Sequence, residues 1–137
     1  MSVSPVLRRP RMTAQQRAVL DLLHSSDRFR GAQRLHCELR QGHGVRIGLV
    51  TVYRILSLFT EMKITETQRA EDGEMLYRLR TTSHHRHYLV CRQCGRAIAF
   101  TANEVECFTK QLAQQHRFTD VAHQIDFYGT CPLCTEI

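Results

Sequence analysis

The sequence lacks the long apolar runs and the export features that would place it in or across a membrane. No apolar stretch approaches the about 20 residues that a membrane-spanning helix needs. The N-terminus, MSVSPVLRRPRM, has arginines but no apolar core, so we expect no secretory signal and a cytoplasmic location. Internal repeats and low-complexity segments are also absent. The 137 residues, 42% of them hydrophobic, predict one or two small globular domains.

Acidic residues are scarce in the first half of the chain. Residues 1–63 hold 11 Lys and Arg against 4 Asp and Glu, a net charge of +7, whereas residues 64–137 carry −1. The first twelve residues form a basic arm that includes Arg11. A basic segment of this kind is suited to meet nucleic acid. The imbalance predicts a nucleic-acid-binding module joined to a module with another task.

Three helical patterns and a hairpin follow the basic arm. The first helix starts at a capping box, TAQQ, and the second, GAQRLHCELRQGHG, ends at Gly42 and Gly44. The third pattern is VTVYRILSLFTEMK. The segment KITETQRAEDGEMLYRLR reads as two strands around a turn at Asp72-Gly73. Together they predict a winged helix-turn-helix domain over residues 1–80.

The third helix is the candidate DNA reader. Its apolar stripe consists of Val52, Ile55, Leu56, Phe59 and Met62. The outward face presents Thr51, Tyr53, Arg54 and Ser57. Arg54 can reach guanine or a phosphate, and Tyr53 can touch a base edge. An ordinary amphipathic helix has the same pattern, but the basic arm and the charge imbalance favour DNA binding.

The composition changes at TTS (81–83), which we interpret as a linker. Beyond it, HYLVC, RAIAF and AHQIDFY (122–128) are typical of strands. A helix is expected to start at Asn103, with an N-x-x-E capping box to Glu106. The apolar face of this helix would consist of Val105, Phe108 and Leu112. The fold class is thus α+β, a winged helix followed by a small α/β domain over residues 84–137.

Two C-x2-C pairs are the strongest chemical signal in the sequence. Without an export signal the compartment is reducing, where paired cysteines hold metal more often than they form disulfides. The pairs comprise Cys91, Cys94, Cys131 and Cys134. Four thiolates can close a tetrahedral shell around zinc, which leaves no open position for a substrate. A zinc deaminase would also need an H-x-E motif, which is missing here. We therefore expect a structural zinc site and no enzymatic activity.

The segment HHRHYLVC suggests a second metal site. In an extended strand, His85 and His87 point to one face, whereas His84 and Arg86 point to the other. One face therefore offers a pair of imidazoles, and neutral imidazole is the commonest metal ligand. A solvent-exposed polar strand that binds no metal could have the same sequence.

Two residues further along the chain could complete this pair. Glu106 could join His85 and His87, or it could cap its helix or pair with Lys110. His123 lies on the same strand face as Ile125 and Phe127, and could equally be a core histidine. Spacing alone does not decide between these roles.

These blocks resemble the ferric uptake regulator family of bacterial metal-sensing repressors. The resemblance rests on IGLVTVYRILSLF, HHRHYLVCRQCG and DVAHQIDFYGTCPLC, and it runs from about residue 12 to the end. The details are most similar to the zinc uptake regulators of actinobacteria. The resemblance implies a C-terminal dimerisation domain and a homodimer that binds a palindromic operator when loaded with metal. It assigns Tyr53 and Arg54 to the major groove and Arg11 to the DNA backbone or minor groove.

The family resemblance leaves two arrangements of the histidines open. Without a gap before Cys91, His85 and His87 join Glu106 and His123 in the dimerisation domain. With one inserted residue, His85 and His87 serve a site between the domains, and His84 takes their place beside Glu106 and His123. In this inter-domain site, Glu66 matches an acidic ligand of the zinc members. The hinge cysteine of those members falls near Arg80, where this chain has none.

The sequence thus predicts a zinc-responsive repressor that binds double-stranded DNA and controls metal-uptake genes. Zinc would occupy the structural site and the second site, which iron or manganese could also enter. We expect no membrane partner and no small organic substrate. An iron- or peroxide-responsive member of the family, and a DNA-binding adaptor with structural zinc alone, are the alternatives.

Overall fold

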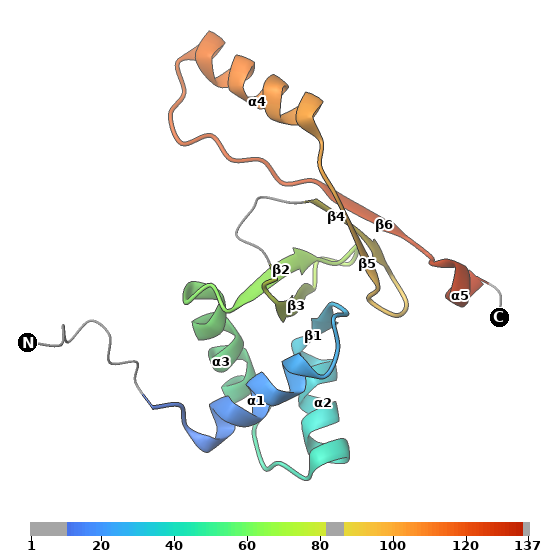
Figure 1. Ribbon diagram of the computed structural model, residues 1–137. Helices are drawn as coiled ribbons and strands as arrows, with labels where there is room; N and C mark the ends of the chain where they lie inside the picture. The colour runs from blue at the N-terminus through green and yellow to red at the C-terminus, as the bar shows by residue number, and fades with distance from the viewer. Residues whose placement is uncertain (1–10, 82–86, 136–137) are drawn as a thin grey trace, which may run out of the picture.

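The computed structural model describes residues 11–81 and 87–135, which form two sheets with separate sets of helices (Figure 1). In the N-terminal part, the helices are α1 (Ala14–His24), α2 (Ala32–His43) and α3 (Leu49–Glu61). Its sheet has the order β1-β3-β2, made of β1 (Arg30–Gly31), β2 (Thr65–Arg69) and β3 (Met75–Leu79). Strands β2 and β3 pair antiparallel as the predicted hairpin. This is a winged helix-turn-helix, as the sequence predicts.

Local signals fix the ends of the first two helices. The Thr13 side chain accepts a hydrogen bond from the Gln16 amide at 3.1 Å, and the Gln16 side-chain oxygen accepts one from the Thr13 amide at 3.0 Å. The predicted capping box is therefore present. Helix α2 ends at Gly44, whose φ of +61° is left-handed. The prediction for Gly42 was wrong, because this residue continues the last turn of α2.

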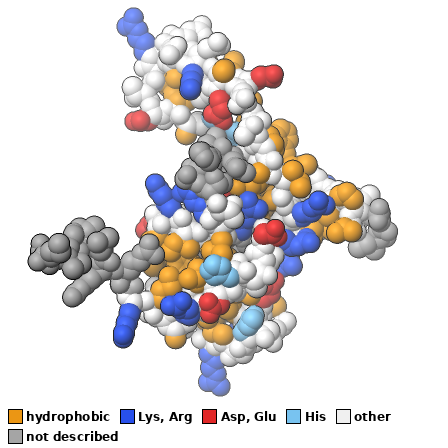
Figure 2. Space-filling model, in the orientation of Figure 1, with side chains coloured by type: hydrophobic (Ala, Val, Ile, Leu, Met, Phe, Trp, Pro, Cys, Tyr) orange, Lys and Arg blue, Asp and Glu red, His pale blue; other side chains and the backbone are white. Residues whose placement is uncertain are grey.

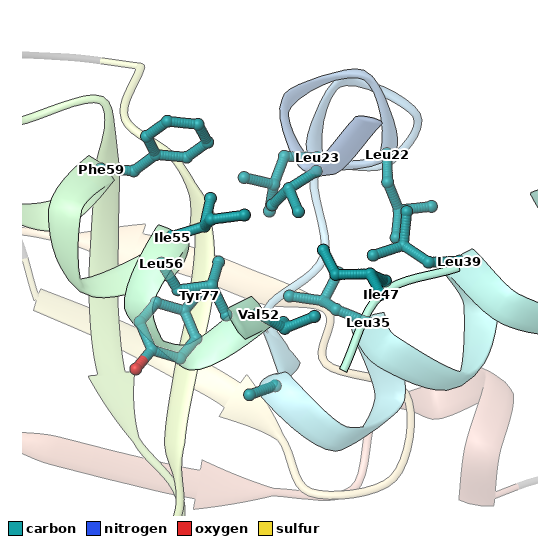
Figure 3. Packing of buried hydrophobic residues seen from close by; sticks show 12 residues of the cluster. Leu22, Leu23, Leu35, Leu39, Ile47, Val52, Ile55, Leu56, Phe59 and Tyr77 are labelled. Atoms are coloured by element: carbon teal, nitrogen blue, oxygen red, sulfur yellow. The ribbon is translucent and has the colours of Figure 1, made fainter. Parts of the chain in front are cut away.

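The apolar stripe of α3 packs against α1 and α2 in one buried cluster (Figure 3). Val52, Leu56 and Phe59 are each 1% exposed or less. The expectation that Met62 belongs to this stripe was wrong, because it is the C-cap residue and is 48% exposed. The stripe thus ends where the helical periodicity ends.

The C-terminal domain is built around a central strand. Strand β4 (His87–Cys91) pairs antiparallel with β5 (Ala97–Phe100) and parallel with β6 (Asp126–Gly129). Helix α4 (Asn103–His116) stands off one end of this sheet, and the short α5 (Pro132–Thr135) lies at the other end (Figure 1). No helix among the described residues is long and apolar enough to cross a membrane.

Two details of this domain differ from the sequence predictions. The strand predicted over 122–128 begins only at Asp126, because His123 leaves the sheet direction and turns towards α4. The predicted capping role of Asn103 was wrong, because the N-cap is Ala102 and no side chain caps this end. Glu106 is turned towards two histidines instead.

The two faces of the C-terminal sheet have different surroundings. Tyr88 and Val90 are buried against Phe29 of the winged-helix domain. On the other face, Leu89, Ile98 and Phe127 are 43%, 47% and 49% exposed. Figure 2 shows hydrophobic side chains reaching the surface over this sheet. The predicted apolar face of α4 also contains no buried residue. The chain therefore presents an apolar surface that it does not cover itself.

Truncation of Leu56 tests the packing of the winged-helix core. Leu56 is fully buried, so Leu56→Ala should lower the free energy of unfolding of this domain by about 2–5 kcal/mol. Leu58, in the same helix but 38% exposed, is the matched control, and Leu58→Ala should cost far less. Denaturant unfolding followed by circular dichroism measures both. Equal losses for the two variants would contradict this packing.

Candidate functional site

The four paired cysteines converge at one end of the C-terminal sheet. Cys91 ends β4 and lies beside Gly129 of the parallel strand β6, so both C-x2-C pairs emerge at the same edge. All four sulfur atoms lie within 4.8 Å of one another, and those of Cys94 and Cys131 are 3.7 Å apart. A tetrahedron of thiolates with zinc–sulfur bonds of about 2.3 Å has edges of about 3.8 Å. The donor set and its spacing therefore fit zinc.

Hydrogen bonds prepare these sulfurs unequally for ionisation. Burial raises the pKa of the Cys91 thiol, but backbone amides, that of Cys131 foremost, lower it to about 6. The Cys131 amide lies 3.3 Å from this sulfur. The pKa of Cys134 is raised to about 12, first by its hydrogen bond with Cys131 and then by burial. Cys91 thus forms a thiolate readily, whereas Cys134 resists ionisation beside the other three sulfurs. A bound cation would allow all four to ionise together.

Three side chains from distant parts of the C-terminal domain form a second cluster. The Nε2 atoms of His87 and His123 lie 3.1 Å and 3.0 Å from the same oxygen, Oε1 of Glu106. The two Nε2 atoms are 3.4 Å apart. Ligands bound at about 2.0–2.1 Å around a tetrahedral ion are separated by about 3.3–3.4 Å. The three donor atoms therefore form a triangle of the size that one divalent cation needs.

A hydroxyl group fixes the ring of His123. Thr109 donates its hydroxyl proton to the Val105 carbonyl at 2.9 Å. The same oxygen lies 3.3 Å from Nδ1 of His123, and with its proton engaged it can accept the Nδ1 proton. In this tautomer the neutral ring carries its lone pair on Nε2, the atom that faces Glu106. Thr109 is not among the site residues predicted from the sequence, although it lies three residues after Glu106, on the same side of α4.

The remaining predicted metal ligands have different outcomes. His84 and His85 lie outside the described residues, so their assignment stays a prediction. His87 lies with Glu106 and His123, which is the grouping that the ungapped alignment predicts. Glu66 is in neither cysteine nor histidine cluster, and its carboxylate instead contacts Arg78 and Tyr88.

The residues predicted to read DNA lie on the exposed side of α3. Tyr53 is 41% exposed, Arg54 and Ser57 are exposed, and Thr51 is half-buried. Arg11, at the start of the described chain, is also exposed. The N-cap of α3 is Gly48, and no side chain caps this end. The first amide groups of α3 are thus left for another acceptor, such as a phosphate.

Comparisons with known proteins agree with this architecture. The sequence model described as "Ferric uptake regulator family" matches residues 8–128. The zinc uptake regulation protein of Mycobacterium tuberculosis is 44% identical over 124 residues, which cover 90% of this chain and 94% of that protein. The crystal structure of FurB from M. tuberculosis, a zinc uptake regulator, shares 44% identity and a TM-score of 0.50, over 88% of this chain and 92% of that chain.

A second solved structure is similar at lower identity. A zinc uptake regulator complexed with zinc and DNA has 27% identity and a TM-score of 0.70, over 96% of this chain and 87% of that chain. The family resemblance inferred from the sequence is thereby confirmed. The chain belongs to the ferric uptake regulator family.

Proposed function

We propose that this chain is a metal-dependent, zinc-responsive transcriptional repressor. It binds palindromic operator DNA as a metal-loaded homodimer and controls metal-uptake genes. The observation that carries this proposal is the convergence of His87, Glu106 and His123 on one cation-sized position, in a chain whose winged helix exposes Arg54. The 44% identity to a zinc uptake regulation protein supports zinc as the metal.

DNA binding relies on the exposed face of α3. Arg54 and Tyr53 lie on adjacent positions of this face, where they can meet base edges and phosphates. The uncapped start of α3 at Gly48 directs amide groups outwards, which suits a phosphate oxygen. The excess positive charge of residues 1–63 adds sequence-independent attraction. These features together form a DNA-binding face on the winged helix.

A second copy of the chain covers the apolar face of the C-terminal domain. Leu89, Ile98 and Phe127 lie side by side across three paired strands, as the register of β4 with β5 and β6 requires. Phe108 of α4, which is 61% exposed, adds to this surface. An apolar surface of this kind is unfavourable in water unless another protein surface covers it. A two-fold dimer would present two α3 helices to the two halves of a palindrome.

The two metal sites have different tasks. The four cysteines fix the end of the chain onto β4, and as a closed set they keep the domain folded. The second site joins β4, α4 and the segment before β6, and the Glu106 side chain there is 37% exposed. Zinc, or iron or manganese in its place, would supply the positive charge that holds these three elements together. Binding changes the DNA affinity only if the cation favours the DNA-competent dimer.

The same features argue against other classes of function. The cysteine site is saturated by its own sulfurs and offers no position for a substrate. The chain therefore acts as a regulator and not as an enzyme, with no small organic substrate. Its place of action is the cytoplasm, where operator DNA is found.

Replacement of Arg54 tests the DNA-binding face. Arg54→Ala should weaken specific operator binding by about 1–3 kcal/mol per half-site, because it removes the principal base contact. Arg96→Ala, which removes an exposed arginine from the C-terminal domain, should leave specific binding nearly intact. Fluorescence anisotropy with a labelled duplex, at fixed salt and zinc, measures both. If Arg54→Ala binds as wild type does, α3 is not the reading helix.

Replacement of one paired cysteine tests the closed zinc site. Cys94→Ser should release one equivalent of zinc and unfold or monomerise the C-terminal domain, because the site ties the turn after β4 to the turn after β6. Cys107→Ser is the matched control, since Cys107 is exposed on α4 and lies outside the cluster. Zinc content by mass spectrometry and the oligomeric state by light scattering report the outcome. A stable dimer of Cys94→Ser would argue against a structural role.

Replacement of Thr109 tests the second site. Thr109→Val keeps the shape of the side chain but removes the acceptor for Nδ1 of His123. We expect the metal affinity of this site to fall about 10- to 100-fold, with the cysteine-bound zinc unchanged. Thr101→Val, at an exposed position before α4, serves as the control. Competition with a chromophoric chelator gives the affinities, and equal values for the two variants would remove the proposed role of Thr109.

A further inference from the structure

The winged-helix domain and the C-terminal domain share a small core of their own. Phe29, which is 1% exposed, lies edge to face with Tyr88 of β4, with ring centroids 5.4 Å apart. The Phe29 amide also donates to the Gly95 carbonyl at 2.9 Å. Gly95 directly follows Cys94, so the turn that carries the first cysteine pair contacts the winged-helix domain through its backbone. The covalent linker is therefore not the only connection between the domains.

Arg78 of β3 lies at the centre of this contact. Its guanidinium stacks over the Phe29 ring at 4.6 Å and over the Tyr88 ring at 4.5 Å. Its Nε donates to Oε1 of Glu66 at 2.6 Å, and the Tyr88 hydroxyl donates to the same oxygen at 3.0 Å. The side chains of Arg78 and Glu66 are only 11% and 17% exposed. The four side chains thus form one connected, largely dehydrated network.

We infer that Arg78, with Phe29, Glu66 and Tyr88, positions the winged helix against the C-terminal domain without a metal ion. We call these four residues the Arg78 latch. This docking is inferred from the contacts just described and does not require the proposed function. Its consequence for operator recognition rests on the proposed function.

The charges at this position do not favour a cation. A guanidinium 2.6 Å from Oε1 already neutralises the Glu66 carboxylate, and it would repel a divalent ion placed beside it. Among the described residues, the clusters able to hold a metal do not include Glu66. In the latch, the Arg78 guanidinium therefore pairs with Glu66, the residue that the family resemblance predicted to be a metal ligand.

Other contacts between the domains define their relative orientation less well. The Arg92–Glu71 pair spans 2.9 Å, but its side chains are 47% and 58% exposed, so its contribution is small. The Gln68 amide donates to Asp126 at 2.5 Å, a single bond near one end of β6. Within the part of the chain that the structure describes, Arg78 is the residue that combines a charged hydrogen bond with contacts to two rings from different domains. A rotation of the winged helix would break these interactions together.

Gly95 provides a second fixed point for the same orientation. Its φ of +78° is left-handed, and a Cβ there would overlap the Phe29 carbonyl oxygen. The two backbones therefore approach as closely as a glycine allows. Together with the Arg78 latch, this close approach fixes the orientation at a second place, in addition to the weaker Arg92–Glu71 and Gln68–Asp126 contacts.

Amide hydrogen exchange at Phe29 measures the docking directly, because this amide bonds across the interface. In Arg78→Met, which keeps the length but removes the charge, we expect exchange at Phe29 to rise at least about tenfold. The Ile64 and Ala70 amides, which donate to the Phe59 and Glu74 carbonyls inside the winged-helix domain, should change little. Tyr88→Phe, which removes only the hydroxyl, should give a smaller increase. Wild-type protection of Phe29 in Arg78→Met would overturn the inference.

Two controls separate the latch from other effects. Arg40→Met removes an exposed arginine at the far end of α2 and should leave Phe29 protected. Glu106→Gln removes the carboxylate of the His87–Glu106–His123 cluster and should also leave Phe29 protected. Protection of the Phe29 amide could instead be lost in Glu106→Gln, or when metal is removed from the second site of the wild type. In that case docking depends on metal and the inference is wrong.

A DNA measurement then tests positioning. The probe is a duplex selected from a random library by the zinc-loaded wild type, together with versions whose half-sites are moved apart by one or two base pairs. Wild type should bind the selected spacing much more tightly than the altered spacings. In Arg78→Met, we expect this ratio of affinities to fall at least about tenfold. Unchanged discrimination would contradict the positioning role. Should the wild type select no duplex, the proposed function fails, while the exchange result at Phe29 still decides the docking.

Discussion

The pairing of strand β4 with a neighbour on each side is the constraint on which the rest of the C-terminal half depends. The parallel partner β6 brings the second cysteine pair to the end of β4, where Cys91 lies. The antiparallel partner β5 places Phe100 beside His87, with ring centroids 5.7 Å apart. Both candidate metal clusters and the contact with the winged helix therefore use residues of this five-residue strand.

The two clusters gain different properties from their positions along β4. At one end, four sulfur atoms from two tight turns surround a single point and complete a tetrahedral ligand set. At the other end, His87 is buried while its partner Glu106 comes from a helix that stands off the sheet. A site whose parts come from separate, loosely packed elements changes more on binding a cation than one built from adjacent turns. The cysteine site is therefore suited to hold the domain folded, and the His87–Glu106–His123 site is suited to respond to the metal concentration.

Much of this arrangement could be predicted from the sequence because it follows from periodicity. The C-x2-C spacing and the alternation around His87 are local properties of the chain. The grouping of Glu106 and His123 with His87 came from the family resemblance, and here the geometry brings the same three together. The partners of Glu66 could not be predicted, because Arg78 and Tyr88 reach it only once the hairpin docks on β4. The exposure of Leu89 could not be predicted from the sequence either, because the alternation of side chains along a strand does not show what covers each face of the sheet.

Adjacent residues of β4 serve opposite faces, and this has a consequence for how the sequence can vary. His87 contributes to the cation site on one face, and Tyr88 contacts Arg78 on the other. Because side chains alternate along a strand, an insertion or deletion of one residue between His87 and Cys91 would exchange these faces. The phenol would then point to the cation site and the imidazole to the guanidinium. A substitution at His87 or Tyr88 affects the function on one face of the strand, whereas a change in the length of this segment would disable both functions at once. The spacing of three residues before Cys91 is therefore as much a part of the site as the ligands.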